Sequence, residues 1–336
     1  MKRTRRGVVV VMATLWLLAP AAAAFAETVW KVALFGPPRA VTKPLEWYAQ
    51  EALKRTNGQL KIELVYGEAL AKAKEMPEGL KAGAFEMAFL CASYYPGKFP
   101  LLTVLDLPML TPDDIDAQSR LSLAMAEQPA VVDELKRWNT MLFLPIPLPQ
   151  YQVMGKKRIT QATDFKGVRV RVSGEMAKVL EDYGAVKSLV PAPETFTALE
   201  RGVIDSVTMA STYMFASYRI YEVSKYFTDK ISLGTQPCFY GLSLTAWDKL
   251  PPATKKTLLE LREGLTQRYV EAYAAADEKN YAEFRKRGIE IINFPASERA
   301  KLLAGAARHW KAWVADADKR GLKGTEVFEF VRTRLK

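Results

Sequence analysis

The sequence predicts an α/β protein made of two lobes with a cleft between them. Three observations indicate this: apolar strand-like stretches alternate with amphipathic helices, the chain of 336 residues is long enough for two domains, and one late helical stretch is very long. Because ligands of open α/β sheets bind outside the carboxyl ends of the strands, we expect the cleft to be the binding place.

The first elements follow the order βαβαβ, which is typical of a parallel sheet covered by helices. Leu45, Tyr48, Ala49 and Leu53 give the first helix an apolar stripe. In order, the expected elements are a strand at 28–36 that ends at Gly36-Pro37-Pro38, a helix at 43–58 that stops at Asn57-Gly58, an alternating strand at 59–67, a short helix at 76–83 and an apolar strand at 85–90.

A second βα set is expected between residues 150 and 234. It follows a helix that begins near Asp113 and Asp114, whose carboxylates suit a helix N-terminus, and an apolar run at 140–148. In order, the set consists of the strand YQVMGKK, the strand VRVRV, a helix from about 174 to 183, the strand VKSLV, the helix PETFTALERG and the strand VIDSVTM.

The last third of the chain is mainly helical. The apolar strand CFYGLSLT at 238–245 precedes a stop at Leu250-Pro251-Pro252. From Pro252 to about Arg287 the pattern is helical except for Gly264, and two amphipathic helices follow the segment GIEIINFP.

These elements divide the chain into two discontinuous domains. Two α/β lobes of about 120–160 residues with a very long late helix imply that the chain crosses between the lobes more than once. The expected boundaries are 1–26 for a signal peptide, 27–148 plus 235–274 for lobe I, and 149–234 plus 275–336 for lobe II.

The N-terminal residues have the three regions of a secretory signal peptide. MKRTRR is basic, an apolar run follows, and small residues at Ala24 and Ala26 form an A-x-A-like site, so we expect cleavage after Ala26. An uncleaved membrane anchor is the alternative, because residues 7–26 are nearly long enough to span a bilayer. A cleaved signal peptide predicts a soluble protein in the periplasm.

Charge and motifs argue against a nucleic-acid-binding protein and give little support for an enzyme. The net charge is +11, but the basic residues are scattered, and the densest clusters, at 156–158 and 285–287, have the pattern of solvated surfaces. His309, the one histidine, lies in an ordinary amphipathic pattern, and no GxSxG, HExxH, CxxC, GxGxxG or P-loop motif occurs. We expect no metal and no cofactor.

The only two cysteines, Cys91 and Cys238, lie in apolar sequence. An exported protein can oxidise them, but a chain with a large core does not need the bond. A disulfide and two buried free thiols are therefore both compatible with the sequence.

The stretch GVRVRVSG at 167–174 alternates valine with arginine. In a strand, Arg169 and Arg171 point to the face opposite the valines, and two guanidiniums there need water or a partner of opposite charge. The alternation alone does not identify that partner.

The stretch 164–211 resembles the solute-binding proteins of tripartite ATP-independent periplasmic (TRAP) transporters, the DctP-type family. Phe196 stands where that family usually has tyrosine. The central motif positions are Asp164-Phe165-Lys166-Gly167, Arg169, Arg171, Gly184-Ala185, Glu194, Phe196, Ala198-Leu199, Gly202 and Asp205. Weaker matches are LDLPML at 105–110, YEVSKYF at 221–227 and WDKLPP at 247–252.

The resemblance implies a two-lobed venus-flytrap fold of the periplasmic-binding-protein type, with a long helix between the lobes and a membrane permease as partner. It also implies that Arg171 forms a two-point salt bridge with a ligand carboxylate, a task that suits a planar guanidinium. Arg169 matches a position that is usually lysine and is read as an exposed or structural charge. The alternative for Arg171 is a salt bridge within the protein.

Departures from the family's sugar-acid-binding members indicate a less polar pocket. Such members place a second arginine where this chain has Tyr151 and an asparagine where it has Met209. Other pocket positions fall on Cys91, Tyr94, Phe35, and either Phe239 or Tyr240, although any of these aromatics can be core residues. The resulting ligand is a small organic acid: a monocarboxylate, a hydroxy or oxo acid, or an aromatic acid that stacks on tyrosine.

The sequence therefore predicts an extracytoplasmic receptor that captures an organic acid and delivers it to TRAP permease subunits. A ligand-binding sensor for a signalling kinase would share the same pocket, and an exported α/β enzyme is the remaining alternative.

Overall fold

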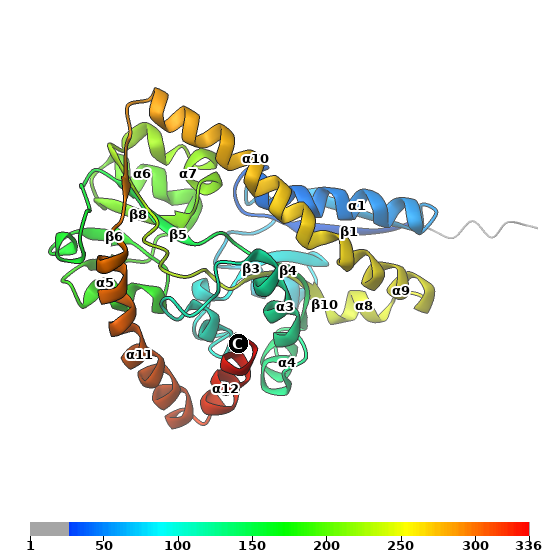
Figure 1. Ribbon diagram of the computed structural model, residues 1–336. Coiled ribbons are helices and arrows are strands. Elements are labelled where there is room, and N and C mark those ends of the chain that lie inside the picture. The colour runs from blue at the N-terminus through cyan, green and yellow to red at the C-terminus, as the bar shows by residue number, and fades with distance from the viewer. Residues whose placement is uncertain (1–26, 336) are drawn as a thin grey trace, which may run out of the picture.

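The computed structural model describes residues 27–335, and the expected signal peptide at 1–26 lies outside the described residues. Two β-sheets with helices around them make up the described chain (Figure 1), so the α/β class is confirmed. Each sheet takes strands from separate stretches of the sequence. Residues far apart in the chain therefore meet where the two sheets face each other.

The first sheet has five strands in the order β2-β1-β3-β10-β4. β1 pairs in parallel with β2 and β3, as the βαβαβ order predicts, whereas β10 runs antiparallel to β3 and β4. The late strand β10 thus returns the chain to the first sheet. The strands are β1 (Thr28–Ala33), β2 (Leu60–Val65), β3 (Met87–Cys91), β4 (Thr140–Ile146) and β10 (Cys238–Ser243).

The second sheet has six strands in the order β11-β9-β5-β8-β6-β7. β6 lies parallel to β7 and β8, and β5 lies antiparallel to β8 and β9. The strands are β5 (Tyr151–Gly155), β6 (Arg169–Arg171), β7 (Val186–Ser188), β8 (Ser206–Ala210), β9 (Tyr226–Asp229) and β11 (Glu290–Asn293).

Twelve α-helices occur among residues 27–335, none of them long and apolar enough to cross a membrane. Asp114 caps α3, because its carboxylate accepts a hydrogen bond from the Ala117 amide at 2.6 Å. The helices are α1 (Lys43–Arg55), α2 (Met76–Ala82), α3 (Ile115–Met125), α4 (Pro129–Lys136), α5 (Lys178–Glu181), α6 (Thr195–Glu200), α7 (Tyr213–Ser217), α8 (Leu244–Asp248), α9 (Pro252–Glu260), α10 (Leu265–Lys286), α11 (Ala296–Lys319) and α12 (Gly324–Arg334).

The helical stretch expected from 252 to 287 is divided in two. A 3-10 turn at Leu261–Gly264 separates α9 from α10. Gly264 faces the ring of Trp47, and a Cβ on that glycine would lie 2.8 Å from the ring. Close packing against α1, together with the low helix propensity of glycine, accounts for the break.

Helix α10 crosses from one sheet to the other (Figure 1). It packs on α1 and α3 beside the first sheet and on α7 beside the second. Tyr273 donates a hydrogen bond of 2.8 Å to the Pro147 carbonyl in the segment that joins β4 to β5. Asp277 accepts 2.9 Å and 2.8 Å bonds from the amide and hydroxyl of Thr212, which follows β8. One helix is thus tied to both halves of the protein, the first half being the part around the first sheet and the second half the part around the second sheet.

The C-terminal helices also connect the two halves. α11 packs against α5, and α12 returns to α3 (Figure 1). The indoles of Trp310 and Trp313 donate to the Pro108 carbonyl at 2.9 Å and to the Thr103 hydroxyl at 2.8 Å. The domain boundaries given above stay a prediction.

Candidate ligand-binding site

The candidate site lies where the carboxyl ends of strands from the two sheets meet. Phe35 follows β1 and Tyr94 follows β3 in the first sheet, while Arg171 ends β6 in the second. All three side chains are buried, and Arg171 is 0% exposed. This is the place at which ligands of such sheets bind.

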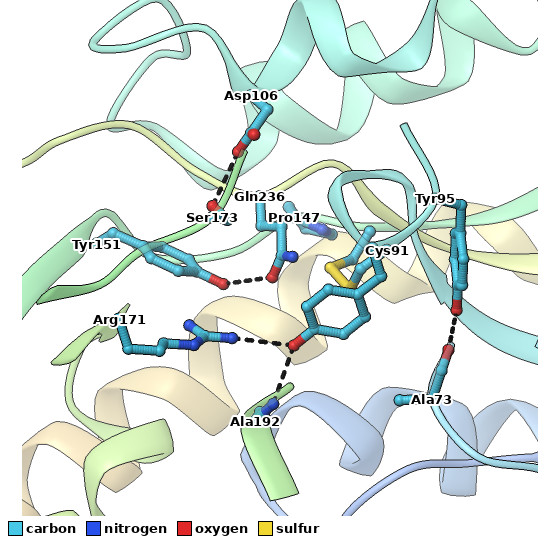
Figure 2. The surroundings of a disulfide bond; sticks show 12 residues. Ala73, Cys91, Tyr95, Asp106, Pro147, Tyr151, Arg171, Ser173, Ala192 and Gln236 are labelled. Atoms are coloured by element: carbon cyan, nitrogen blue, oxygen red, sulfur yellow. Dashed lines mark hydrogen bonds between the residues drawn. A yellow bond between two sulfur atoms is a disulfide. The ribbon is translucent and has the colours of Figure 1, made fainter. Parts of the chain in front are cut away.

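Arg171 is held by three hydrogen bonds inside the protein, and Figure 2 draws the one that its guanidinium donates to a tyrosine hydroxyl. Its Nε donates to the Val190 carbonyl at 2.9 Å, Nη1 donates to the Thr208 carbonyl at 2.9 Å, and Nη2 donates to the Tyr94 hydroxyl at 3.0 Å. A guanidinium carries five N–H hydrogens, so each terminal nitrogen retains one hydrogen without a partner among the described residues. No described carboxylate forms an ion pair with Arg171, in contrast to the alternative of an internal salt bridge.

Tyr94 connects the two halves through its hydroxyl. Besides the bond from Arg171, the oxygen accepts a bond of 3.2 Å from the amide of Ala192, which also belongs to the second half (Figure 2). Because the oxygen accepts two bonds, the phenolic hydrogen is left for a third partner. A carboxylate placed beside Arg171 can accept that hydrogen.

The other arginine of β6 has a different environment. Arg169 is exposed and forms a two-point pair with Asp205, with distances of 2.9 Å and 2.7 Å. The hydrogen bond from Arg169 lowers the pKa of Asp205, although burial of the carboxyl opposes it. The prediction of an exposed or structural charge at Arg169 is confirmed.

Asp106 forms a second connection between the halves (Figure 2). Its carboxylate is 0% exposed and accepts bonds from the Ser173 hydroxyl at 2.9 Å and the Glu175 amide at 2.8 Å, just beyond the end of β6. Gly174 lies beneath this carboxylate, and a Cβ on it would be 2.3 Å from Oδ2. Burial raises the pKa of Asp106 to about 7, and the hydrogen bonds from Glu175 and Ser173 oppose that rise.

Phe35 lies beside Tyr94, with ring centroids 5.9 Å apart, and also contacts Phe89 at 4.7 Å. The structure therefore brings together three of the residues that the sequence assigns to the site, Arg171, Tyr94 and Phe35.

Cys91, another assigned residue, forms a disulfide with Cys238, which joins β3 to β10 and decides the alternative that the sequence leaves open. Neither sulfur is therefore a free thiol. The bridge lies three residues before Tyr94 and two residues after Gln236, so it holds the end of the first sheet beside the site (Figure 2).

Three further predicted residues have less direct relations to Arg171. Tyr151 is buried and donates its hydroxyl to the Gln236 side chain at 2.9 Å (Figure 2). Met209 is buried in β8 next to Thr208, whose carbonyl binds Arg171. Phe239 contacts Phe99 at 6.3 Å and does not join the group around Arg171.

Tyr240 follows Phe239 in β10 and is its alternative in the sequence analysis. The ring of Tyr240 contacts Phe89 at 5.4 Å, and Phe89 in turn contacts Phe35. Because successive residues of a strand point to opposite faces, only one of the two can face the site. The ring contacts place Tyr240 on that side.

Sequence reasoning missed several groups at this interface. Arg39 is 5% exposed and lies over the ring of Phe35 at 5.4 Å, and the hydroxyl of Tyr218 is buried without a hydrogen-bond partner. Gln236, in the segment that leads into β10, keeps a buried Nε2 without a partner. A signal for Arg39 exists in the sequence, because it follows Gly36-Pro37-Pro38 directly after a strand, at the carboxyl end where ligands bind.

Titratable groups that would suit metal binding are not gathered in the described chain. Among residues 27–335, no group of three or more His, Cys, Asp or Glu side chains is arranged to hold a metal ion. His309 of α11 contacts the carboxylate of Asp182, at the end of α5, at 2.8 Å, and no contact joins it to Arg171.

Comparison with known proteins gives a family match over most of the chain. Residues 37–316 match the family model of bacterial extracellular solute-binding proteins, family 7 (DctP). A C4-dicarboxylate-binding periplasmic protein from Rhodobacter capsulatus is 28% identical over 262 residues, which cover 75% of this chain and 76% of the relative.

Solved structures show the same fold. A marine metagenome TRAP solute-binding protein specific for aromatic acids, solved with metahydroxyphenylacetate, superposes with a TM-score of 0.80 and 22% identity over 92% of this chain and 98% of that one. An extracytoplasmic solute receptor from Bordetella pertussis that binds pyroglutamic acid gives a TM-score of 0.77 and 24% identity, over 91% of this chain and 100% of that one.

The family match covers most of the chain, and the fold neighbours are two-lobed solute-binding receptors. The predicted venus-flytrap fold is therefore confirmed. The chain belongs to the bacterial extracellular solute-binding proteins of family 7, the DctP family of TRAP-type receptors.

Proposed function

We propose that this protein is the extracytoplasmic receptor of a TRAP transporter and that it captures a small organic acid through a salt bridge between Arg171 and the ligand's carboxylate. The observation that carries the proposal is a fully buried guanidinium at the interface of two sheets, with no carboxylate partner among the described residues. Burying a charge without a counter-charge is costly, so an anion at this place is strongly favoured.

The two N–H hydrogens that remain on the terminal nitrogens of Arg171 give the ligand two contacts, and the Tyr94 hydroxyl gives a third. Hydrogen bonds to charged groups contribute about 1.5–3 kcal/mol each. The Val190 and Thr208 carbonyls fix the plane of the guanidinium before the ligand arrives, which lowers the entropy cost of binding.

The surroundings favour a small acid with few hydroxyl groups. Phe35, Tyr94 and Tyr151 offer aromatic faces, and Met209 is buried on the neighbouring strand. Monocarboxylates, hydroxy or oxo acids and aromatic acids satisfy these groups. The relatives described above bind aromatic acids, pyroglutamic acid and C4-dicarboxylates, which are all small carboxylic acids.

Binding and closure are one process in this proposal. Tyr94 and Asp106 of the first half contact Arg171, Ser173 and Glu175 of the second half only when the halves are together. A ligand that bridges the halves shifts the population toward this closed form by as much as it binds that form more tightly. The closed form then presents the surface that permease subunits bind.

The predicted signal peptide at 1–26 and the family match support a periplasmic location, from which the receptor delivers its ligand to the membrane. No covalent step, metal or cofactor is needed for this function. The ligand is therefore expected to leave the protein chemically unchanged.

The test compares two matched variants against a panel of small carboxylic acids by thermal shift and calorimetry. We expect at least one acid to stabilise the wild-type protein, and Arg171→Lys to weaken that acid about 100-fold, because an ammonium cannot replace the planar fork. Arg169→Lys, on the same strand, is the control and keeps the wild-type affinity.

A panel without any binding acid, or equal affinities in the two variants, would overturn the proposal. Recovery of the bound acid by NMR after incubation separates a receptor from an enzyme. A receptor returns the acid unchanged, whereas conversion into a product would assign the site to an enzyme.

A further inference from the structure

Arg39 is a second buried guanidinium at the same interface. It follows the Gly36-Pro37-Pro38 turn beyond the end of β1 and is 5% exposed. Its Nη1 donates to the carbonyls of Phe35 and Pro37, both at 2.8 Å, and its Nε is buried without a hydrogen-bond partner. The guanidinium is thus oriented by its own loop while part of it is left unbonded.

The guanidinium of Arg39 contacts aromatic rings rather than a carboxylate. Among residues 27–335 it forms no ion pair, and its guanidinium instead lies over the rings of Phe35, Phe89 and Tyr218 at 5.3–5.6 Å. Aromatic faces offset part of the cost of a buried cation, but an anion offsets more. Arg39 and Arg171 are therefore two buried guanidiniums without an ion pair among the described residues, one from each sheet, at one interface.

Tyr218 lies beside the Arg39 guanidinium. Its hydroxyl is buried without a partner, and it comes from the second half, after α7. Burial raises the pKa of Tyr218 to about 12, Arg39 and Arg171 both oppose that rise, and Tyr94 adds to it. The Arg39 guanidinium lies 5.6 Å from the centre of the Tyr218 ring. On its other side it lies over Phe35, whose ring contacts Tyr94, the tyrosine that accepts a hydrogen bond from Arg171.

The contact between Tyr218 and the Arg39 loop depends on a glycine. A Cβ on Gly36 would lie 2.3 Å from the Tyr218 oxygen and 3.0 Å from Arg39 Nη1. Gly36 also has φ of +75°, a conformation that side chains disfavour. The loop is thus shaped so that the Tyr218 hydroxyl and the Arg39 guanidinium approach one place from opposite halves.

We propose that Arg39 and Tyr218 form a second acid-binding point, and that the preferred ligand carries two anionic groups, one for Arg171 and one for Arg39. This inference rests on the proposed function and specifies its ligand as a dicarboxylic acid. It revises the preference for simple monocarboxylates, which was drawn from residues that did not include Arg39 or Tyr218. A monocarboxylate leaves one of the two buried guanidiniums without a counter-charge.

The experiment measures affinities by calorimetry for matched acids: butanoate against succinate and glutarate, and benzoate against its 1,3- and 1,4-dicarboxylates. We expect at least one dicarboxylate to bind the wild-type protein about tenfold or more tightly than its monocarboxylate partner. In Arg39→Gln and Tyr218→Phe this ratio should fall below about threefold, while the affinity for the monocarboxylate stays within about threefold of wild type.

Two control variants report on structural effects. Arg55→Gln removes an exposed arginine that pairs with Glu51 on α1, and Tyr226→Phe removes a hydroxyl on β9. Both should keep the wild-type ratio. Tyr218→Phe deletes a hydroxyl that has no partner in the ligand-free protein, so a folding defect would not explain a change in the ratio.

The inference is wrong if monocarboxylates bind as tightly as dicarboxylates in both series, or if the preference survives Arg39→Gln. Either result leaves the proposed receptor function intact, because an acid still binds through Arg171. If no acid in the panel binds at all, the receptor function itself fails, and the second binding point fails with it.

Discussion

The two ends of strand β6 carry the same residue in opposite environments. Arg169 is exposed and satisfied by the Asp205 carboxylate, whereas Arg171, two residues later on the same face, is fully buried and bonds only to neutral oxygens. The exposed pair is complete within one half of the protein. The buried guanidinium is incomplete, and its third bond comes from Tyr94 in the other half.

The difference between Arg169 and Arg171 shows that burial and partners, rather than position in the strand, distinguish a candidate binding arginine from a surface arginine. Alternation along a strand identifies the face of a side chain, but the cost of a charge depends on burial and on its partners. An exposed ion pair contributes little to stability and needs no ligand. A buried cation without a counter-charge carries a desolvation cost, and in the proposed function the carboxylate of the ligand offsets that cost.

The largest expected effect is the loss of the buried side chain. Arg171→Ala removes the donors of two buried carbonyls and leaves a cavity, so the free energy of unfolding of the ligand-free protein should fall by about 2–4 kcal/mol. Arg169→Ala should lower the free energy of unfolding far less, because the ion pair that it removes is exposed. Urea unfolding of both variants checks this contrast, and equal losses would contradict it.

The next effect concerns the backbone just beyond the buried end of β6. Gly174→Ala would place a Cβ 2.3 Å from Asp106 Oδ2, so the two halves cannot approach fully and ligand affinity should fall about tenfold or more. Gly97→Ala is the matched control, since a Cβ there meets no atom within 4 Å. Calorimetry on both variants decides whether closure depends on this contact, and an unchanged affinity in Gly174→Ala would separate closure from binding.

The buried end of β6 should also respond to pH through Asp106. Burial raises the pKa of this carboxyl to about 7, above its unfolded value of about 3.9, so the folded state binds the proton more tightly. Stability contributed by protonated Asp106 is therefore full below about pH 4 and is lost as the pH rises toward 7. Glu175 adds to the rise in pKa through its negative charge, and Ser173 opposes it through its hydrogen bond.

Asp106→Asn keeps the shape and removes the charge. Its melting temperature relative to wild type should rise between pH 5 and pH 8, by an amount that corresponds to on the order of 2 kcal/mol. A difference that does not vary with pH would show that Asp106 stays ionised across this range.

The smallest effect on stability and ligand affinity is expected at the exposed end of β6, where Arg169 pairs with Asp205. The Arg169 hydrogen bond lowers the pKa of Asp205, so the stability that this pair contributes is present above about pH 4 and is lost at lower pH. Arg169→Gln should cost little stability at pH 7, none near pH 2, and no ligand affinity. A loss of affinity in this variant would mean that the two ends of the strand are not independent.

Much of the fold is predictable from local patterns. Apolar runs locate β1, β3, β4 and β10, and the βαβαβ order predicts the parallel pairing of β1 with its neighbours. The antiparallel insertion of β10 between β3 and β4 is not predictable in this way, because it depends on where the chain returns after the second sheet. The break at Gly264 likewise depends on its contact with Trp47 from a distant helix.

The candidate site is less accessible to sequence reasoning, because it is made where two sheets meet. Arg171, Tyr94 and Phe35 are found from their positions after strands and from resemblance to a family. The same reasoning cannot choose between Phe239 and Tyr240, since that depends on which face of β10 is turned inward. Sequence reasoning does not find Arg39 or Tyr218. Their buried atoms without hydrogen-bond partners, and their contact with each other, can be seen only in the folded structure.

The disulfide has a consequence for how this protein withstands damage. Cys91 and Cys238 are 147 residues apart in the sequence, and the ring that they close contains every strand of the second sheet except β11. A protease cut anywhere inside that ring leaves both fragments covalently attached. Such a nicked molecule migrates as one species on a denaturing gel until a reductant is added, so a single cut in this ring does not release half of the protein.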